Sequence, residues 1–483
     1  MAIESLVQRC LAVCESVFKR TQKPRKRAVR MPRVAVEDLE IRCFLSATAG
    51  LATIIQPDGK TLVIGSSTDL ANGNSDFAIA RLNVDGTPDT TFSGDGQVLI
   101  PFNLLGSDGG EDVANSVALQ SDGKILVGGY SQASLNGDYD FAIARLNYDG
   151  SLDTTFGSDG KVTVDFHLGA GSDDRATGVA VAPDGKIVVG GTASRSFSGD
   201  TDFALARLTS NGTLDAAFSG DGLKTIAFNQ GGSRQDAASG IAVQPNGAIV
   251  IAGSAERNWS GNYDFAVARV TAKGDMDKSF AGTGKRTIAF DLGGARDDGA
   301  TSVALQGTNI VLGGFAQTDI DGNFDFAAVR LKSNGNLDKS FSKDGRQTVA
   351  FDLGGLGDDE VFAIAPQADG RLLLAGIVQL TDTGNYDYGV VRLTPNGSLD
   401  PAFGTAGQLL LPIDLTGDGA DAAYAVANDP LSNEFVVAGT AGTDDQGGSS
   451  AAVVRLTWNG TLDALFATGG LATINFEDPA SPV

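Results

Sequence analysis

Acidic and amide side chains recur in this sequence just before the repeated words DFA, DFAL and DYG. The densest case is DIDGNFD, which places Asp319, Asp321, Asn323 and Asp325 at alternate positions. Oxygen ligands in a glycine-containing loop suit calcium, although this stretch lacks the distant glutamate that would bind the ion through both oxygens. The same residue types also form Asx turns that cap strand ends. The pattern therefore supports either a calcium site or a set of structural turns.

Aromatic side chains stand in the same acidic loops. They are Tyr139, Trp259, Tyr263, Phe324 and Tyr386. An acidic face with exposed rings can bind carbohydrate or a basic partner, whereas rings that cover neighbouring loops have a purely structural role. We expect any partner, a protein or a cell-envelope polysaccharide, on this acidic loop face.

A second recurring feature is an arginine followed by an aspartate eight residues later. The arginine ends a strand-like run whose faces are expected to be buried, where an unpaired charge is very costly. We therefore predict one structural ion pair for each copy. The pairs are Arg81 with Asp89, Arg145 with Asp153, Arg207 with Asp215, Arg269 with Asp277, Arg330 with Asp338, Arg392 with Asp400, and Arg455 with Asp463.

Signatures of enzymes are scarce. The chain has one histidine, His167, so a histidine-based metal triad cannot form within it. We see no G-x-S-x-G nucleophile motif after a strand and no phosphate-binding loop. We expect a protein without catalytic residues or a required cofactor, calcium being the one candidate ion. A carboxylate-based glycan hydrolase or lyase is the less favoured alternative.

These residues belong to seven copies of one unit. The phenylalanine of the D-x-x-F words recurs at intervals of 61 to 64 residues, at Phe92, Phe156, Phe218, Phe280, Phe341, Phe403 and Phe466. Within one copy, strand-like runs cover 116–120, 125–130, 141–147 and 161–166, separated by Asp-Gly turns and loops. Four antiparallel strands for each copy correspond to one blade of a β-propeller.

The strands are apolar on both faces, so each sheet must pack between two others. In FAIAR, the bulky Phe141 and Ile143 point one way and the small Ala142 and Ala144 point the other. Separate domains or a solenoid fit this pattern less well than a closed ring, and seven copies lie within the known range of blades. We predict an all-β, seven-bladed propeller of four-stranded antiparallel blades. The blades are predicted at 51–103, 112–166, 174–228, 235–290, 297–351, 358–413 and 421–476. With no strand shared between the last and first blades, we expect face packing alone to close the ring.

The words DFAIARLNxDGxLDxxFGxDGK resemble the delta-60 repeat family, and the resemblance covers residues 51 to about 476. It implies a propeller-like β fold in large bacterial extracellular proteins and implies no catalytic activity or ligand. Copy seven departs from the pattern, because Ser450 replaces aspartate and DPLSNEF replaces an Asp-Gly hairpin. Copy five likewise reads QGTNI at that hairpin.

Residues 1–50 form a basic leader, with ten Lys and Arg against five Asp and Glu and all three cysteines. Its stretch VEDLEIRCFLSA resembles the LEPR-XLL motif, with Ile41 in place of proline. That resemblance implies export or surface attachment. A disordered basic tail and a nuclear-type signal are the alternatives. Residues 477–483 form a short tail.

The charge balance limits the partners. The chain has a net charge of −23, so its acidic body repels phosphate backbones and nucleic acid is not an expected partner. No apolar run reaches 18 residues, so no transmembrane helix is predicted. We expect an exported or cell-surface monomer that acts as an interaction or structural module, with the cytoplasm as the alternative location. A calcium-dependent carbohydrate- or partner-binding protein is the alternative function.

Overall fold

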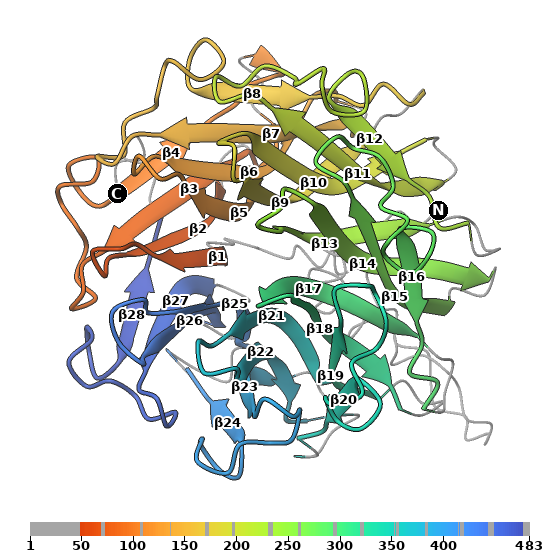
Figure 1. The fold of residues 1–483 in the computed structure, drawn as a ribbon. Helices are drawn as coiled ribbons and strands as arrows, with labels where there is room; N and C mark the ends of the chain where they lie inside the picture. The colour runs from red at the N-terminus through yellow and green to blue at the C-terminus, as the bar shows by residue number, and fades with distance from the viewer. Residues whose placement is uncertain are drawn as a thin grey trace, which may run out of the picture.

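Each repeat folds into one four-stranded antiparallel sheet in the computed structural model of the chain, and seven sheets surround a central channel (Figure 1). The predicted seven-bladed propeller is confirmed. The structure describes residues 49–68, 73–106, 110–135, 137–169, 173–195, 199–229, 235–258, 262–292, 297–318, 323–351, 353, 357–381, 385–413, 415, 420–442 and 449–476. Nearly all of the predicted leader and the whole tail lie outside these ranges. Within them, no helix is long and apolar enough to cross a membrane.

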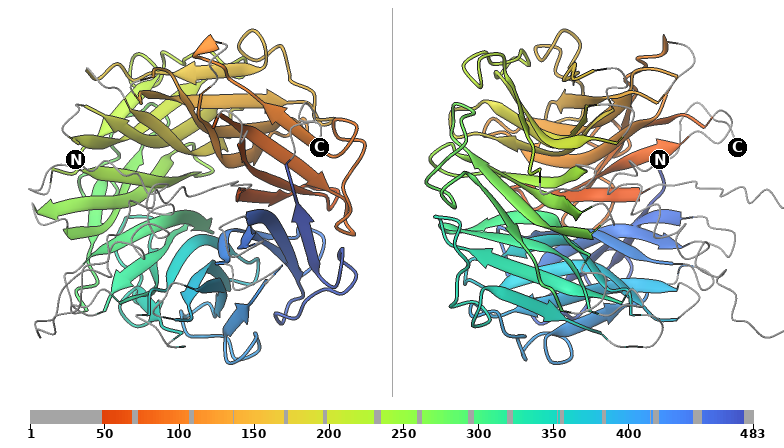
Figure 2. Two further views of the ribbon diagram at one scale, coloured as in Figure 1. Left: turned by 180° about the vertical axis from the view of Figure 1, so that it is seen from behind. Right: turned by 90° about the vertical axis from the view of Figure 1, so that its right-hand side faces the viewer.

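The strands follow one another around the ring in chain order (Figures 1 and 2). Blade one holds β1 (Ala49–Ile55), β2 (Thr61–Thr68), β3 (Ser75–Leu82) and β4 (Gln97–Ile100). Blade two holds β5 (Asp112–Leu119), β6 (Ile125–Gln132), β7 (Tyr139–Leu146) and β8 (Lys161–Val164). Blade three holds β9 (Asp174–Val181), β10 (Ile187–Ser194), β11 (Thr201–Leu208) and β12 (Leu223–Ile226). Blade four holds β13 (Asp236–Val243), β14 (Ile249–Asn258), β15 (Asn262–Val270) and β16 (Lys285–Ile288).

The remaining three blades repeat this order. Blade five holds β17 (Asp298–Gln306), β18 (Asn309–Gln317), β19 (Phe324–Leu331) and β20 (Arg346–Val349). Blade six holds β21 (Glu360–Pro366), β22 (Leu372–Gln379), β23 (Tyr386–Leu393) and β24 (Gln408–Leu411). Blade seven holds β25 (Ala422–Asn428), β26 (Phe435–Gly442), β27 (Ser449–Leu456) and β28 (Leu471–Ile474). The first strand begins at Ala49, two residues before the predicted blade boundary.

Large side chains of one blade pack against small side chains of the next. Phe141 and Ile143 of blade two share a buried cluster with Ala204 and Ala206 of blade three. The same arrangement joins Phe77 and Ile79 of blade one to Ala142 and Ala144 of blade two. This interlocking, predicted from the alternation in FAIAR, lets adjacent sheets approach closely without leaving voids.

Each of the seven arginines named above forms an ion pair with its aspartate, with Nε–Oδ2 distances of 2.6–2.9 Å. Its guanidinium carbon also lies 4.6–4.9 Å from the centre of the repeat phenylalanine ring. Burial alone would raise the pKa of Asp153, but hydrogen bonds from Lys124 and Thr155 and the charge of Arg145 hold it well below its usual range. The carboxylate therefore stays ionised beside its buried guanidinium.

The same arginine also reaches the next blade. Its Nη1 donates to a backbone carbonyl in the following blade's turn, as Arg330 does to Pro395 at 2.7 Å. Arg455 of blade seven donates in this way to Val84 of blade one, and the amide of Ala467 donates to the carbonyl of Asp85 at 2.6 Å. The ring therefore closes through hydrogen bonds as well as face packing, although no strand is shared. Face packing alone was the wrong expectation.

Candidate functional site

The residues of the predicted calcium loop are only partly described. Asp319 and Asp321 lie outside the described residues, whereas Asn323 and Asp325 lie at the start of β19. The carbonyl of Asn323 accepts a hydrogen bond from the amide of Thr318 at 2.8 Å, and Asp325 stands opposite Ala316 in the sheet. Calcium binding by this loop therefore stays a prediction.

The rings predicted on the acidic face are mostly covered. Tyr139 and Tyr386 are 8% and 5% exposed. Tyr139 packs edge-on against Tyr130, with ring centres 5.3 Å apart, and its hydroxyl donates to Glu111 at 2.5 Å. An exposed ring platform is therefore the wrong interpretation for Tyr139 and Tyr386. Of the other three, Tyr263 donates to Gln235 at 2.7 Å, Phe324 packs on Phe315, and Trp259 lies outside the described residues.

The innermost strand of every blade carries one extra residue, a β-bulge, beside the channel. The bulged residues are Leu51, Asn115, Thr177, Ser239, Thr301, Phe362 and Tyr424. A bulge interrupts the two-residue alternation of a strand and redirects a side chain. The sequence alternation did not reveal it, because one added residue in a short apolar strand leaves no separate signal.

In six of the seven blades, a glycine in the second strand makes room for the bulge. In blade four, a Cβ atom on Gly253 would lie 2.0 Å from the carbonyl oxygen of Ala237, which no side chain can tolerate. Equivalent glycines in five other blades give distances of 1.8–2.0 Å, and they are Gly129, Gly191, Gly314, Gly376 and Gly439. The repeated GG and AG words of the second strand are the sequence signal that could have indicated the bulge.

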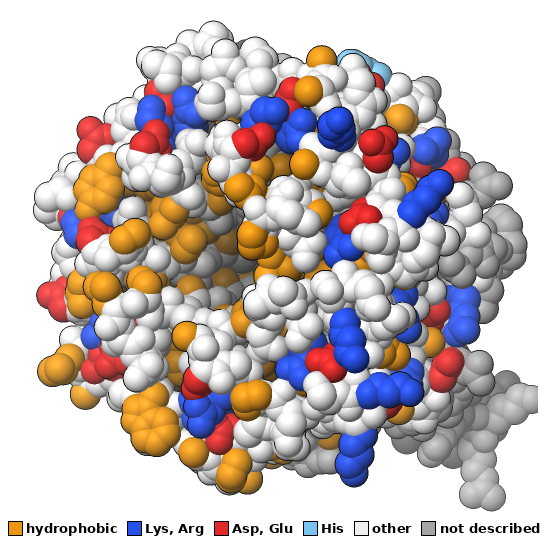
Figure 3. Space-filling view, viewed as in Figure 1, with side chains coloured by type: hydrophobic (Ala, Val, Ile, Leu, Met, Phe, Trp, Pro, Cys, Tyr) orange, Lys and Arg blue, Asp and Glu red, His pale blue; other side chains and the backbone are white. Residues whose placement is uncertain are grey.

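The bulged side chains divide the wall of the channel into two parts. Blades two to five contribute an amide and three hydroxyls, whereas blades six and seven contribute two aromatic rings. The rings of Phe362 and Tyr424 lie 5.3 Å apart between centres. The channel has a volume of about 580 Å³, and its described lining includes no charged side chain. Figure 3 shows one mouth as a central hollow with hydrophobic side chains on its rim and the charged groups mostly farther out.

Some of the polar channel groups are already engaged between neighbouring innermost strands. Asn115 Nδ2 donates to the carbonyl of Ala176 at 2.8 Å, and Ser239 Oγ donates to that of Ala300 at 2.9 Å. These bonds fix the orientation of the side chains while each hydroxyl or amide oxygen keeps capacity to accept a further hydrogen bond. These polar side chains of the channel wall are therefore held in fixed orientations.

A ring of buried aspartates, which sequence reasoning missed, joins the blades. Each carboxylate accepts an amide hydrogen bond of 2.6–2.9 Å from the second residue after the fourth strand of the preceding blade. These aspartates are Asp112, Asp174, Asp236, Asp298, Asp359 and Asp421. They recur at the same interval as the other repeat residues, which is the signal that could have separated them from the exposed acids beside them.

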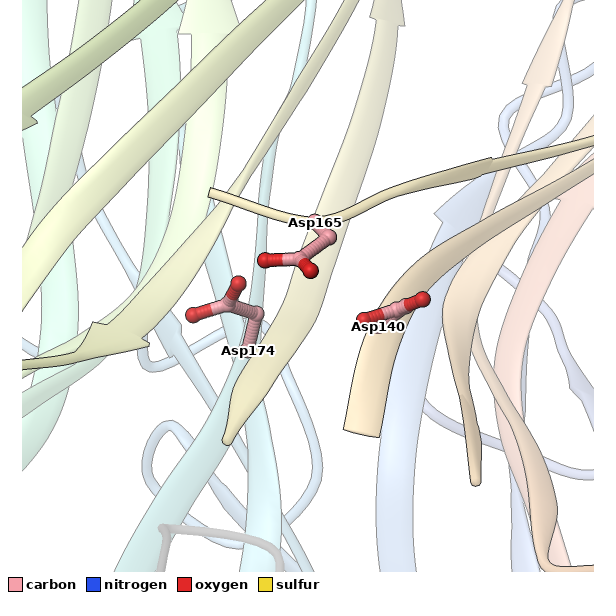
Figure 4. A group of neighbouring side chains, drawn as sticks. All are labelled: Asp140, Asp165 and Asp174. Atoms are coloured by element: carbon pink, nitrogen blue, oxygen red, sulfur yellow. The ribbon is translucent and has the colours of Figure 1, made fainter. Parts of the chain in front are cut away.

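One blade junction holds three carboxylates close together. Asp140 on β7, Asp165 after β8 and Asp174 on β9 each place an oxygen within 4.8 Å of the others (Figure 4). Burial, with the nearby charge of Asp165, raises the pKa of Asp140 to about 6. Burial also raises the pKa of Asp174 to about 7, against the hydrogen bond from the Phe166 amide. The single histidine belongs here, because His167 Nδ1 lies 2.7 Å from Asp165 while its own ring is largely exposed.

Comparison with known proteins identifies a family. A family model described as "Domain of unknown function (DUF5122) beta-propeller" matches slightly more than half of the chain. The matched residues are 56–92, 120–156, 182–218, 244–280, 309–341, 367–403 and 434–466. No curated protein matches the sequence.

Several solved structures are similar to this chain at low sequence identity. A prolyl oligopeptidase B from Galerina marginata is 13% identical with a TM-score of 0.42, and the match covers 88% of this chain and 51% of the peptidase. This chain therefore spans about half the length of that protein. Sqt1 from Chaetomium thermophilum is 14% identical with a TM-score of 0.42, covering 88% and 87%. The polysaccharide lyase Uly1 is 12% identical with a TM-score of 0.44, covering 86% and 91%. These similarities concern the fold alone.

Proposed function

Because the chain belongs to the β-propeller family described as a domain of unknown function (DUF5122), we propose that it is a non-enzymatic, exported interaction module. Its binding site is the central channel, and its ligand class is a neutral carbohydrate chain. The basic leader with its LEPR-XLL-like stretch and the acidic body support the exported location. The acidic loop face, which the sequence favoured, is the less supported surface because Tyr139 and Tyr386 are buried there.

The aromatic pair in the channel carries this proposal. Phe362 and Tyr424 face the same hollow as the hydroxyls of Thr177, Ser239 and Thr301. A sugar offers apolar C–H groups on its ring faces and hydroxyls on its edges, so it matches a wall with rings on one side and hydrogen-bonding groups on the other. Aromatic rings supply a large apolar contact area for such a ligand. The volume of about 580 Å³ lies within the usual range for small-molecule sites.

The charge distribution supports a neutral ligand and a binding role. The described channel wall consists of aliphatic, hydroxyl, amide and aromatic groups. The carboxylates with raised pKa values, Asp140 and Asp174 among them, lie at a blade junction and are not part of that wall. An acid–base pair must come within reach of a bound substrate to act on it. Binding without turnover is therefore the better supported function for the channel.

Serine substitutions in the aromatic pair test the proposal. Phe362→Ser and Tyr424→Ser give blades six and seven a residue that blade four already carries at Ser239, so the bulge itself is retained. Isothermal titration with neutral hexose oligosaccharides of four to six sugars should show binding by the wild type and at least a tenfold loss in the double variant. Trp458→Ala, at an exposed turn, is the matched control and should bind normally. The proposal would be refuted if the wild type bound none of these oligosaccharides, or if the double variant bound them as tightly as the wild type does.

A further inference from the structure

Cationic side chains accompany the junction aspartates in two neighbouring places. Between blades three and four, Arg195 forms an ion pair with Asp202, and Lys285 donates to the carbonyl of Ala227 at 2.6 Å. Between blades four and five, Arg257 lies 3.6 Å from Asp264, and Arg346 donates to the carbonyl of Ala289 at 2.6 Å. Both junctions thus place two positive charges beside their buried carboxylates, and the second also includes Asp291, which lies 3.5 Å from Arg257.

The junction between blades two and three lacks these positive charges. Ala133 occupies the position of Arg195 and Arg257, and Leu223 occupies that of Lys285 as the first residue of the fourth strand. Asp165 occupies the position at which the next two junctions carry alanine. This junction therefore gains a carboxylate and lacks both of the cations, which leaves three acids in one small space.

One oxygen of this cluster has no partner in the protein. Asp174 is fully buried, and its Oδ2 accepts the amide of Phe166 at 2.8 Å, but its Oδ1 accepts no hydrogen bond from any described residue. The equivalent oxygen of Asp421 accepts the amide of Gly442 at 2.9 Å. That of Asp236 likewise accepts no hydrogen bond from any described residue, but its junction holds Arg195 and Lys285 as positive charges. A buried carboxylate oxygen without a partner is costly, so something else must compensate it.

We propose that Asp140, Asp165 and Asp174 bind one calcium ion at the junction of blades two and three. Calcium takes oxygen ligands at about 2.3–2.6 Å, so ligands on opposite sides of one ion are up to about 5 Å apart. Oxygens that all lie within 4.8 Å of one another satisfy this condition. The ion replaces the missing Arg and Lys as the positive charge of the junction, and water completes its coordination.

The remaining contacts of the site orient its ligands. The backbone amide of His167 donates to Asp165 Oδ1 at 2.5 Å, and its ring nitrogen lies 2.7 Å from Oδ2. These contacts orient the carboxylate of Asp165, which points toward Asp174 in Figure 4. Because the three ligands come from β7, the segment after β8 and β9, the ion would bind blade two to blade three. This site does not depend on the ligand of the channel.

Two substitutions that copy the neighbouring junctions test the site. Asp165→Ala places alanine where the next junction has Ala227. Ala133→Arg places arginine where that junction has Arg195. Asp159→Ala removes an exposed turn carboxylate of blade two and is the control for lost charge. The full chain is titrated with CaCl2 by calorimetry, and its melting temperature is compared in 2 mM CaCl2 and in EDTA.

We expect calcium to bind to the wild type with a dissociation constant on the order of 10⁻⁴–10⁻³ M and to raise its melting temperature by roughly 2–4 °C. Both Asp165→Ala and Ala133→Arg should lose at least tenfold in affinity at this site, whereas Asp159→Ala should respond as the wild type does. Absence of calcium binding by the wild type would overturn the proposal. Full retention of binding by Asp165→Ala would also overturn it, and an equal response to MgCl2 would overturn the identity of the ion.

Discussion

Two adjacent junctions of the ring both bury carboxylates between blades, but they differ in the charged groups that surround those carboxylates. Between blades three and four, the carboxylates of Asp202 and Asp236 lie beside the side chains of Arg195 and Lys285. Between blades two and three, Asp140 and Asp174 gain Asp165 and lack both cations. The backbone hydrogen bonds that join the blades are the same in both places, because Phe166 and Phe228 donate to their aspartates at 2.8 and 2.6 Å. Two junctions with the same backbone hydrogen bonds can therefore carry different charged side chains.

The largest effect is expected where the two junctions are alike. Arg145→Ala and Arg207→Ala each remove the buried guanidinium of an ion pair and its bond to the next blade, while Lys124 and Lys186 still contact the two aspartates. Loss of one partner of a buried pair costs about 3–5 kcal/mol, so both variants should unfold at clearly lower denaturant concentration. Chemical denaturation measures the loss, and Arg207→Lys, which keeps the charge, should lose less. An unchanged midpoint for Arg145→Ala would show that the pair does not stabilise the ring.

A second shared element is the glycine beside the bulge in blades two to seven. Gly253→Ala would place a Cβ atom 2.0 Å from the Ala237 carbonyl oxygen, so the strand must move. Strain of this kind costs about 1–3 kcal/mol, measurable as a lower melting temperature. Gly240→Ala is the control, because the nearest atom to its added Cβ is 3.4 Å away and Ala363 stands at the same position in blade six. Equal effects of the two substitutions would contradict the steric argument.

The stability of the protein should depend less on pH when Asp236, at the junction of blades three and four, is replaced by asparagine. Burial raises the pKa of Asp236 to about 7 in the folded state, above its unfolded value of 3.8. The folded state then holds the proton more tightly, so stability falls as pH rises between these values, by at most about 1.4 kcal/mol for each pH unit. Asp236→Asn should remove this contribution and gain stability over the wild type from pH 5 to pH 7.5. Melting curves across that range check it, with Asp221→Asn in an exposed turn as the control.

The smallest loss of stability is expected for Arg195, a cation present at the junction of blades three and four and absent from that of blades two and three. Arg195 is 44% exposed at its side chain, so Arg195→Ala should cost only about 1 kcal/mol or less. The loss should shrink further in 0.5 M NaCl, because salt screens exposed pairs. Melting temperatures at low and high salt measure this difference. A loss as large as that of Arg207→Ala would mean that Arg195 acts through packing and not through charge.

Much of the architecture could be predicted from recurrence. The Arg–Asp spacing of eight residues, the turns and the alternation in FAIAR repeat in every blade or nearly so, and the structure brings each arginine to its aspartate. The bulges were not predicted from the alternation, which one extra residue such as Asn115 barely changes, and the GG and AG words of the second strand were their only signal. The buried aspartates also escaped detection, because composition does not distinguish Asp174 from the acids beside it in the same loop.

The sequence by itself determined the number of blades, the order of their strands and the residues of the repeated joint, because these depend on local periodicity and on contacts that recur in each copy. Only the tertiary structure decided which acids meet, which rings reach the channel and how blade seven joins blade one. Asp140, Asp165 and Asp174 lie on three separate segments, and their oxygens come within 4.8 Å only because two blades pack face to face. Charges separated along the chain interact according to their distance in space, and packing sets that distance.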